Sequence, residues 1–300
     1  MVEPKYTVLR GAPMRTAKNM ESSLAVPTAT SVRSVPMKLV IDQRTVINNF
    51  LRTSKGGKVS FTHLVGYAMV KALAAMPDMN NAYDVVDGKP TLIENPGINL
   101  GIAIDVRKGE TRQLLVPNIK GCENLNFFQF WSAYEQVVQK TRAGDLQVSD
   151  FAGTTASLTN PGGIGTNHSV PRLMSGQGVI LGVGNIDYPA EFQGMSPSRL
   201  TDLGVSKVTT LTSTYDHRVI QGATSGEFLK KVHEALLGQR GFYENIFASL
   251  RIPYAPIVWA ADINVDVADN VDKTSRVQEL INSFRVRGHL MADIDPLEYV

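Results

Sequence analysis

Apolar positions along this chain follow two patterns, helical spacing in some segments and short continuous runs in others. Apolar residues three and four positions apart predict amphipathic helices, and short apolar runs bounded by turn residues predict buried strands. We therefore expect helices over residues 15–24, 42–51, 64–76, 127–142 and 224–237, and strands over 37–41, 98–106, 114–117, 154–160, 178–186 and 205–215, with a hairpin joining the second and third strands. Because strands and helices interleave without strict alternation, the sequence predicts an α/β fold with a mixed sheet and packed helices.

The character of the sequence changes twice, which divides the chain into three predicted parts. Residues 1–36 are rich in Ser, Thr, Val and Pro and are expected to form a mobile N-terminal arm. Residues 37–241 carry the strands and helices of the main domain. Residues 242–300 begin with aromatic residues and prolines, continue with an acidic stretch and include an amphipathic helix, so we expect a linker and a mostly helical extension.

The composition excludes several classes of protein. Hydrophobic residues make up 43% and charged residues 19% of the chain, and the formal net charge is +2, which predicts a folded globular protein without the basic excess of a nucleic-acid binder. No stretch reaches the roughly 20 apolar residues of a membrane-spanning helix, and the opening residues lack the apolar core of a signal peptide. The single cysteine, Cys122, excludes an internal disulfide and fits a reducing compartment, so we expect a cytoplasmic protein.

Among the five histidines, His217 has the most informative setting. It follows a predicted strand, and a strand end can project a side chain into a cleft from a rigid mount. A neutral imidazole with an ordinary pKa of about 6.5 can accept the proton of a thiol, whose pKa is about 8.5. The resulting thiolate is the nucleophile that acyl transfer between thiols requires. We therefore interpret His217 as a candidate general base.

A second candidate, Thr159, ends a predicted strand just before the turn at Pro161-Gly162-Gly163. Its hydroxyl can donate a hydrogen bond to the oxyanion of a tetrahedral intermediate, and loss of such a donor costs enzymes roughly 3 kcal/mol. A threonine before a turn is more often structural, so the residues alone leave both interpretations open.

Several motifs in a fixed order resemble the acyltransferases of 2-oxoacid dehydrogenase complexes. The run that contains Asp216-His217-Arg218 resembles the family's Asp-His-Arg-x-x-Asp-Gly signature. The succinyl-transferring branch fits best, and the resemblance covers about residues 9–241. Further matching segments are Leu9-Arg10-Gly11 with Arg15, Val59-Ser60-Phe61-Thr62, Pro77, Asn80-Asn81, residues 99–104, Leu115-Val116-Pro117 and Leu158-Thr159-Asn160-Pro161-Gly162-Gly163.

The resemblance implies a fold like that of chloramphenicol acetyltransferase and a trimer with active sites between subunits. It assigns to His217 the deprotonation of the coenzyme A thiol, and to Thr159 of the neighbouring subunit the stabilisation of the oxyanion. It also implies that Asp216 and Arg15 support the site. The family's aspartate four residues after the histidine is Gln221 here, which keeps hydrogen bonding but loses the charge, so we assign Gln221 a structural role.

Other polar residues are weaker candidates. His168 and Arg172 lie in a predicted loop and are candidate ligands for the succinyl carboxylate or for a phosphate, although a solvated loop is the simpler interpretation. His63 is expected at the surface or as a helix cap, and Cys122 as a packing residue. The residues of this chain predict no metal site. The Asp272-Lys273 pair lacks the small all-β surroundings of a lipoyl carrier, so the lipoyl group is expected from a partner.

Residues 275–297 resemble the beginning of the thiamine-dependent component of 2-oxoglutarate dehydrogenase, as it is fused in the multifunctional 2-oxoglutarate dehydrogenase/decarboxylases of actinobacteria. No Gly-Asp-Gly thiamine motif occurs in these 300 residues, so the resemblance implies that thiamine diphosphate and magnesium bind to the remainder of such a polypeptide. It implies as partners a lipoyl-domain-bearing acyltransferase and a dihydrolipoyl dehydrogenase.

The sequence therefore predicts succinyl transfer between a dihydrolipoyl group and coenzyme A in the oxidation of 2-oxoglutarate, a step of the tricarboxylic acid cycle. Two alternatives stay open. The first is a catalytically silent scaffold that oligomerises and organises the complex, which the residue Gln221 favours and the intact pair of His217 and Thr159 disfavours. The second is an antibiotic acetyltransferase of the same fold, which the C-terminal resemblance disfavours.

Overall fold

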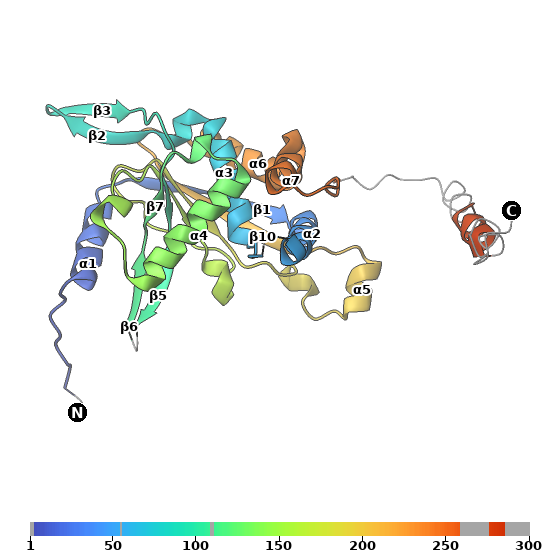
Figure 1. Ribbon diagram of the computed structural model, residues 1–300. Coiled ribbons are helices and arrows are strands. Elements are labelled where there is room, and N and C mark those ends of the chain that lie inside the picture. The colour runs from blue at the N-terminus through green and yellow to red at the C-terminus, as the bar shows by residue number, and fades with distance from the viewer. Residues whose placement is uncertain (1–2, 55, 109–110, 259–275, 286–300) are drawn as a thin grey trace. The chain divides into compact units, whose positions relative to one another are not determined.

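The computed structural model describes residues 3–54, 56–108, 111–258 and 276–285 (Figure 1). The chain divides into two compact units, Met1–Trp259 and Ala260–Val300. In the second unit, residues 276–285 are helical. The α-helices of the first unit are α1 (Ala12–Ser23), α2 (Lys38–Ser54), α3 (Phe61–Ala74), α4 (Phe127–Ala143), α5 (Pro197–Asp202), α6 (Gly222–Leu236) and α7 (Phe242–Leu250).

A six-stranded sheet organises the first unit, with the strands in the order β1-β10-β9-β8-β4-β7. Neighbouring strands run parallel in the pairs β4–β8 and β8–β9 and antiparallel in the other pairs, so the predicted mixed sheet is confirmed. Two separate hairpins, β2–β3 and β5–β6, accompany it. The strands are β1 (Thr28–Pro36), β2 (Ala82–Val86), β3 (Lys89–Ile93), β4 (Leu100–Ile102), β5 (Ile104–Lys108), β6 (Thr111–Leu115), β7 (Asn118–Ile119), β8 (Ala156–Thr159), β9 (Val179–Val183) and β10 (Val208–Asp216).

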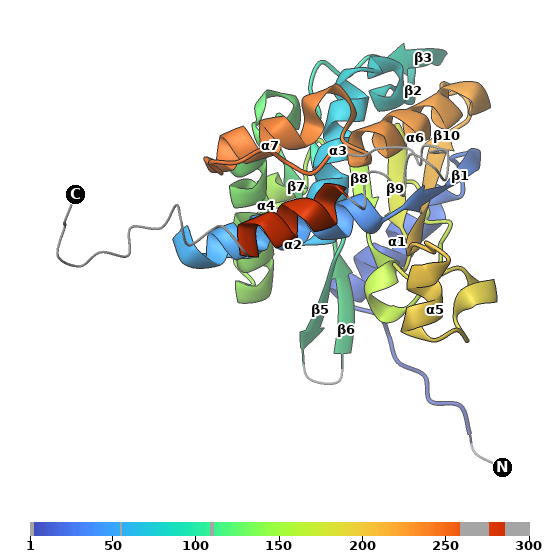
Figure 2. The same cartoon turned by 90° about the vertical axis from the view of Figure 1, so that its right-hand side faces the viewer.

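Helices cover one face of the sheet, where the main hydrophobic core lies (Figure 2). Helix α3 is buried along almost its whole length because its apolar residues are not confined to one stripe. This helix packs against α6, α4 and the strand β9. A helix that is apolar on all sides is typical of the centre of a core rather than of its surface.

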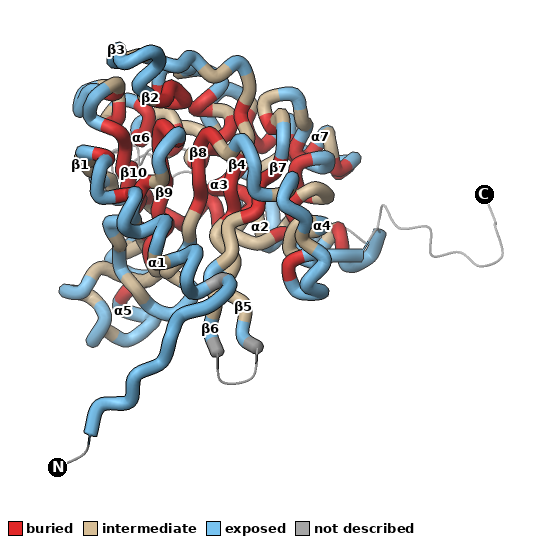
Figure 3. Tube along the Cα trace, turned by 90° about the vertical axis from the view of Figure 1, so that its left-hand side faces the viewer, coloured by how far each residue is buried: buried red, intermediate tan, exposed pale blue. Residues whose placement is uncertain are grey.

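On the opposite face of the sheet, α1 and loops lie in front of the strands (Figure 3). One row of paired residues across this face consists of Thr30, Thr214, Ile180 and Ser157. The hydroxyls of Thr30 and Thr214 are 2.8 Å apart, and Ser157 donates to Gln177 at 2.7 Å. The polar side chains of this row are therefore hydrogen-bonded, as most buried polar groups in proteins are.

The structure corrects the prediction for residues 28–41. The predicted strand at 37–41 is wrong, because α2 already begins at Lys38 and buries Leu39 and Val40. The strand is instead β1, which pairs with β10 along all nine of its residues. The apolar pattern did not predict this strand because many of its residues are Ser, Thr or Arg. The strand is stabilised by pairing at the edge of the sheet rather than by an apolar run. Residues 28–36 are thus part of the folded sheet and not of a mobile arm.

The structure also corrects the prediction that a linker begins directly after residue 241. Helix α7 follows directly and buries five of its residues in the main core: Phe242, Tyr243, Ile246, Phe247 and Leu250. The Tyr243 hydroxyl donates to the carbonyl oxygen of Leu236 at 2.8 Å and so ties α7 to the end of α6. Within the described part of the chain, no helix combines the length and apolarity needed to cross a membrane.

Candidate functional site

His217 lies directly after β10, exposed at the start of a tight turn. Its ring Nδ1 is 3.1 Å from the carbonyl oxygen of Ile220, and its backbone N–H donates to the carbonyl oxygen of Pro27 at 3.0 Å. Since a carbonyl oxygen can only accept, Nδ1 must carry the proton in this contact. The neutral ring then keeps its lone pair on Nε2, which is the form that a general base needs.

The turn that carries His217 is fixed by its neighbours on both sides. The buried Asp216 carboxylate accepts from the Arg218 guanidinium at 2.6 and 2.9 Å and from the Arg218 backbone N–H at 3.1 Å. The Asp216 carboxylate raises the pKa of Arg218, chiefly through this hydrogen bond. The guanidinium carbon also lies 3.9 Å from the ring centre of Tyr83 in β2. The Asp216 carboxylate is thus engaged by Arg218 within the turn that follows β10.

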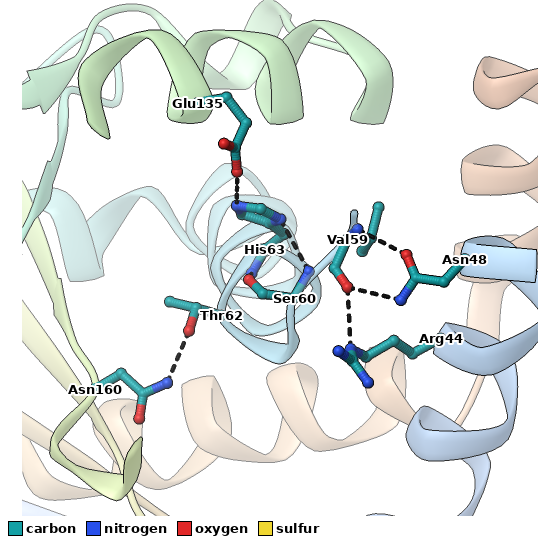
Figure 4. Close-up of polar contacts among 8 residues, drawn as sticks. All are labelled: Arg44, Asn48, Val59, Ser60, Thr62, His63, Glu135 and Asn160. Atoms are coloured by element: carbon teal, nitrogen blue, oxygen red, sulfur yellow. Dashed lines mark hydrogen bonds and ion pairs between the residues drawn. The ribbon is translucent and has the colours of Figure 1, made fainter. Parts of the chain in front are cut away.

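Thr159 is the last residue of β8, half-buried at the opposite end of the sheet. Its predecessor Leu158 lies under α3 and accepts a hydrogen bond from the Ala103 backbone N–H at 2.9 Å. Its successor Asn160 donates from Nδ2 to the Thr62 hydroxyl at 2.7 Å (Figure 4). The end of β8 is therefore held on both sides of Thr159.

Close backbone packing fixes the turn after Thr159. A Cβ at Gly162 would lie 2.2 Å from the carbonyl oxygen of Gly184, so only glycine fits there. At the next position, Gly163, a Cβ would meet nothing within 4 Å. The Pro-Gly-Gly sequence is thus a turn pressed against the end of β9, and Gly162 is the residue that the contact requires.

Within one chain, Thr159 and His217 do not meet. Thr159 pairs with Gly182, which in turn pairs with Thr212. His217 follows Thr212 by five residues, or about 16 Å along the strand direction at roughly 3.3 Å per residue. Two strand spacings add about 10 Å across the sheet. The register therefore places the two candidates at opposite ends of the sheet.

The remaining candidates lie on exposed segments. Arg15 is in α1, and Gln221 is the N-cap of α6 without a side-chain capping bond. His168 and Arg172 lie in the loop before β9 and are both exposed. Across the described residues, the structure shows no hydrogen bond or ion pair that joins Arg15 to Gln221 or His168 to Arg172. No group of three or more possible metal ligands occurs among those residues either.

Sequence reasoning missed a polar cavity of about 520 Å³ between α3, α4 and β5. The charged and polar residues that line it include Lys58, Thr62, His63, Asp105, Glu135 and Asn160. Leu158 of β8 and Asn160, which follows β8, line this cavity, whereas Thr159 does not, because successive side chains of a strand point to opposite faces. The cavity and the Thr159 hydroxyl thus lie on different faces of the sheet.

His63 beside this cavity is buried, so its prediction as a surface residue is wrong, while its prediction as a helix cap is confirmed. Its backbone N–H donates to the Ser60 hydroxyl, and its Nδ1 accepts from the Ser60 backbone N–H at 3.1 Å. Burial, with a contribution from Arg44, lowers the pKa of His63 to about 4. The neutral ring therefore carries its proton on Nε2 and donates to Glu135 at 3.1 Å. The spacing of Ser60 and His63 was the available signal, since it is that of a capping box.

Comparisons with known proteins agree with this architecture. Residues 3–240 match the model of the 2-oxoacid dehydrogenases acyltransferase (catalytic domain) family. The 2-oxoglutarate dehydrogenase E1/E2 component of Corynebacterium glutamicum is 55% identical over 99% of this chain and 24% of its own length. The multifunctional 2-oxoglutarate metabolism enzyme of Mycobacterium sp. (strain JLS) is 57% identical over 97% of this chain and 23% of its own length. This chain thus spans about a quarter of the curated relatives that it matches.

A solved structure supports the fold independently. The dihydrolipoamide acetyltransferase of Azotobacter vinelandii has a TM-score of 0.68 and 23% identity, and the match covers 80% of this chain and 94% of that one. The predicted α/β fold with a mixed sheet and packed helices is thereby confirmed. From the matched residues and this fold, we conclude that the chain belongs to the acyltransferase catalytic-domain family of the 2-oxoacid dehydrogenases.

Proposed function

We propose that this chain is the acyltransferase part of a longer polypeptide and that it moves a succinyl group between a dihydrolipoyl thiol and coenzyme A. The observation that carries the proposal is the contact of His217 Nδ1 with the Ile220 carbonyl oxygen, which leaves Nε2 free to act as a base. The names of two relatives with 55% and 57% identity, both of which refer to 2-oxoglutarate, favour succinyl over other acyl groups.

In the proposed reaction, His217 Nε2 takes the proton of the coenzyme A thiol, and the thiolate sulfur attacks the thioester carbonyl carbon of the succinyl-dihydrolipoyl group. The Thr159 hydroxyl donates to the oxyanion of the tetrahedral intermediate. When the intermediate collapses, its bond to the lipoyl sulfur breaks, and the imidazolium returns the proton to that sulfur. The products are succinyl-coenzyme A and a free dihydrolipoyl group, and the reverse reaction uses the same groups.

We further propose that each site is completed by two copies of the chain, arranged as a trimer. The strand register supports this arrangement, because one chain holds Thr159 about 16 Å along the strand direction from His217. A rotational assembly can bring the Thr159 end of one copy to the His217 end of the next. Arg15 and Gln221 are proposed to support the site, and His168 with Arg172 to bind the succinyl carboxylate.

The surroundings of the reaction are proposals of the same kind. A lipoyl-domain-bearing acyltransferase would present the dihydrolipoyl group, and a dihydrolipoyl dehydrogenase would reoxidise it, in the cytoplasm. The chain after α7 would lead into a thiamine-dependent region, so that thiamine diphosphate and magnesium would act in the remainder of the polypeptide. Such a remainder would correspond to the roughly three quarters of each relative's length that this chain does not match.

The first experiment measures succinyl transfer from succinyl-coenzyme A to dihydrolipoamide for the wild type and for His217→Ala. Loss of the general base should lower kcat/KM by about 100-fold or more. Circular dichroism spectra of the two proteins serve as the folding control. A wild type without turnover would instead support the scaffold that keeps the fold but not the chemistry.

A second experiment tests whether two chains share each site. Co-expressed chains with His217→Ala and Thr159→Ala should recover activity, since some interfaces then combine an intact His217 with an intact Thr159. Random assembly predicts roughly a quarter of the wild-type sites. Activity that stays at the level of the two separate variants would contradict the shared site.

A further inference from the structure

The residue after Thr159 is held by a hydrogen bond on the helical face of the sheet. The Thr159 side chain takes no part in this bond. This hydrogen bond joins Asn160 Nδ2 to the hydroxyl oxygen of Thr62 in α3 at 2.7 Å (Figure 4). The Asn160 side chain meets α3 on the helical face. Thr159 points to the opposite face, because its neighbour Leu158 in β8 lies under α3 and side chains alternate along a strand. Thr62 therefore acts on Thr159 only through the backbone that joins Thr159 to Asn160.

The N-terminus of α3 is fixed by several contacts, so Thr62 is a rigid partner. The backbone groups of Ser60 and His63 are satisfied by the reciprocal capping bonds, and His63 Nε2 reaches Glu135 of α4. The preceding Val59 carbonyl oxygen accepts from Arg44 and from Asn48 of α2, both at 3.0 Å (Figure 4). Three helices thus hold the residue to which Asn160 is bonded.

Directly after Asn160, the chain turns. Pro161 restricts the backbone of Asn160, and the contact of Gly162 with Gly184 fixes the turn. The Asn160 side chain, which is exposed, is the remaining element that could rotate at this point. Its bond to Thr62 removes that freedom next to the residue that must meet the oxyanion.

From these contacts we propose that Thr62 is a positioning residue for Thr159. It holds the end of β8 through Asn160, so that the Thr159 hydroxyl keeps the place that oxyanion stabilisation requires. This inference rests on the proposed function, because it assigns Thr62 a role in acyl transfer. A displacement of about 1 Å at such a donor is sufficient to change a rate by one or two orders of magnitude.

The test compares Thr62→Val, which removes the hydroxyl, with Thr62→Ser, which keeps it. We expect Thr62→Val to lower kcat for succinyl transfer about tenfold with KM changed less than about twofold, and Thr62→Ser to restore most of kcat. The matched control is Thr45→Val, the same change at an exposed helical position whose hydroxyl bonds only within α2. Wild-type kcat in Thr62→Val, or a loss that Thr62→Ser does not reverse, would overturn the proposal.

A double-mutant cycle separates positioning from a general structural role. If Thr62 acts through Thr159, then Thr62→Val should cause no further loss of kcat in a Thr159→Ala background. A further tenfold loss in that background would overturn the inference. The outcomes also separate the proposed acyl transfer from the proposed role of Thr62. If the wild type is active, His217→Ala is inactive and Thr62→Val is unaffected, only the role of Thr62 is rejected. A wild type without turnover would reject both.

Discussion

The two ends of the central sheet hold their candidate residues by different means. At one end, the side-chain hydrogen bonds around His217 join residues within a few positions of one another: Asp216 with Arg218, and the His217 ring with Ile220. Two further contacts, from the His217 backbone to Pro27 and from Arg218 to Tyr83, reach distant residues. At the other end, the segment with Thr159 depends on distant residues, Thr62 for Asn160 and Gly184 for Gly162. The candidate base is thus held mainly by a local motif, whereas the candidate oxyanion donor is held by tertiary packing.

This difference explains why the sequence could predict the surroundings of His217 more fully than those of Thr159. A local motif appears as a compact run of letters, and the run around His217 has this form. The segment with Thr159 is also a compact run, but the residues that hold it, Thr62 and Gly184, are scattered along the chain. The following variants test the two sets of contacts, in order of decreasing expected effect.

The largest effect is expected at the glycine turn beside Thr159. Gly162→Ala would place a Cβ 2.2 Å from a backbone oxygen, so the turn must shift. We expect kcat for acyl transfer to fall about 100-fold, and the free energy of unfolding to fall by about 3 kcal/mol. Gly163→Ala is the matched control, since open space surrounds that position. Equal effects of the two substitutions would contradict the packing of this turn.

The next effect is the pH dependence of the free energy of unfolding that arises from the buried His63 near the N-terminus of α3. Its pKa is about 6.5 in the unfolded chain and about 4 in the folded protein, so the unfolded chain binds more protons between these values. Stability from this group is complete above pH 6.5 and is lost as the pH falls towards 4, by about 3 kcal/mol in all.

The variant His63→Gln tests this pH dependence, because glutamine also suits the third position of a capping box and does not titrate. Urea unfolding at pH 7.5 and pH 4 should show the wild type losing about 3 kcal/mol more than the variant. The same pH dependence in both proteins would show that other groups account for the loss.

A third effect is expected at the pair of Asp216 and Arg218 on either side of His217. Arg218→Gln leaves the buried Asp216 carboxylate without its guanidinium, which should lower the free energy of unfolding by about 2 kcal/mol. The matched control is Arg112→Gln in the β5–β6 hairpin, where an exposed arginine meets Asp105 at 2.7 Å. An exposed pair contributes less than about 1 kcal/mol. Similar losses in chemical denaturation would show that burial of Asp216 is not decisive.

The smallest effect is expected at Gln221, where the resembling family has aspartate. Gln221 is the N-cap of α6, and its side chain makes no capping bond. Aspartate is a strong capping residue, and its charge is favourable at a helix N-terminus. Gln221→Asp should therefore raise the free energy of unfolding by about 0.5–1 kcal/mol at pH 7, measured by urea denaturation. A lower stability would indicate unfavourable charges around this position.

Much of the fold was predictable because the apolar pattern is strong where elements are buried. The helices around Leu64 and Phe130 and the strands around Leu158 and Leu181 lie where the pattern placed them. The strand at residues 28–36 was not predictable in this way, because it lies at the sheet edge and its residues are largely polar. Its position depends on pairing with β10, which lies about 180 residues further along the chain.

The site was predictable only in part for the same physical reason. The sequence by itself determined the candidate base, the glycine turn and the amphipathic helices, because these depend on residues close together in the chain. The tertiary structure alone decided that His63 is buried and neutral, that Thr62 reaches Asn160, and that Thr159 lies at the opposite end of the sheet from His217. Such facts depend on strand order and register, which bring together residues that no local pattern connects.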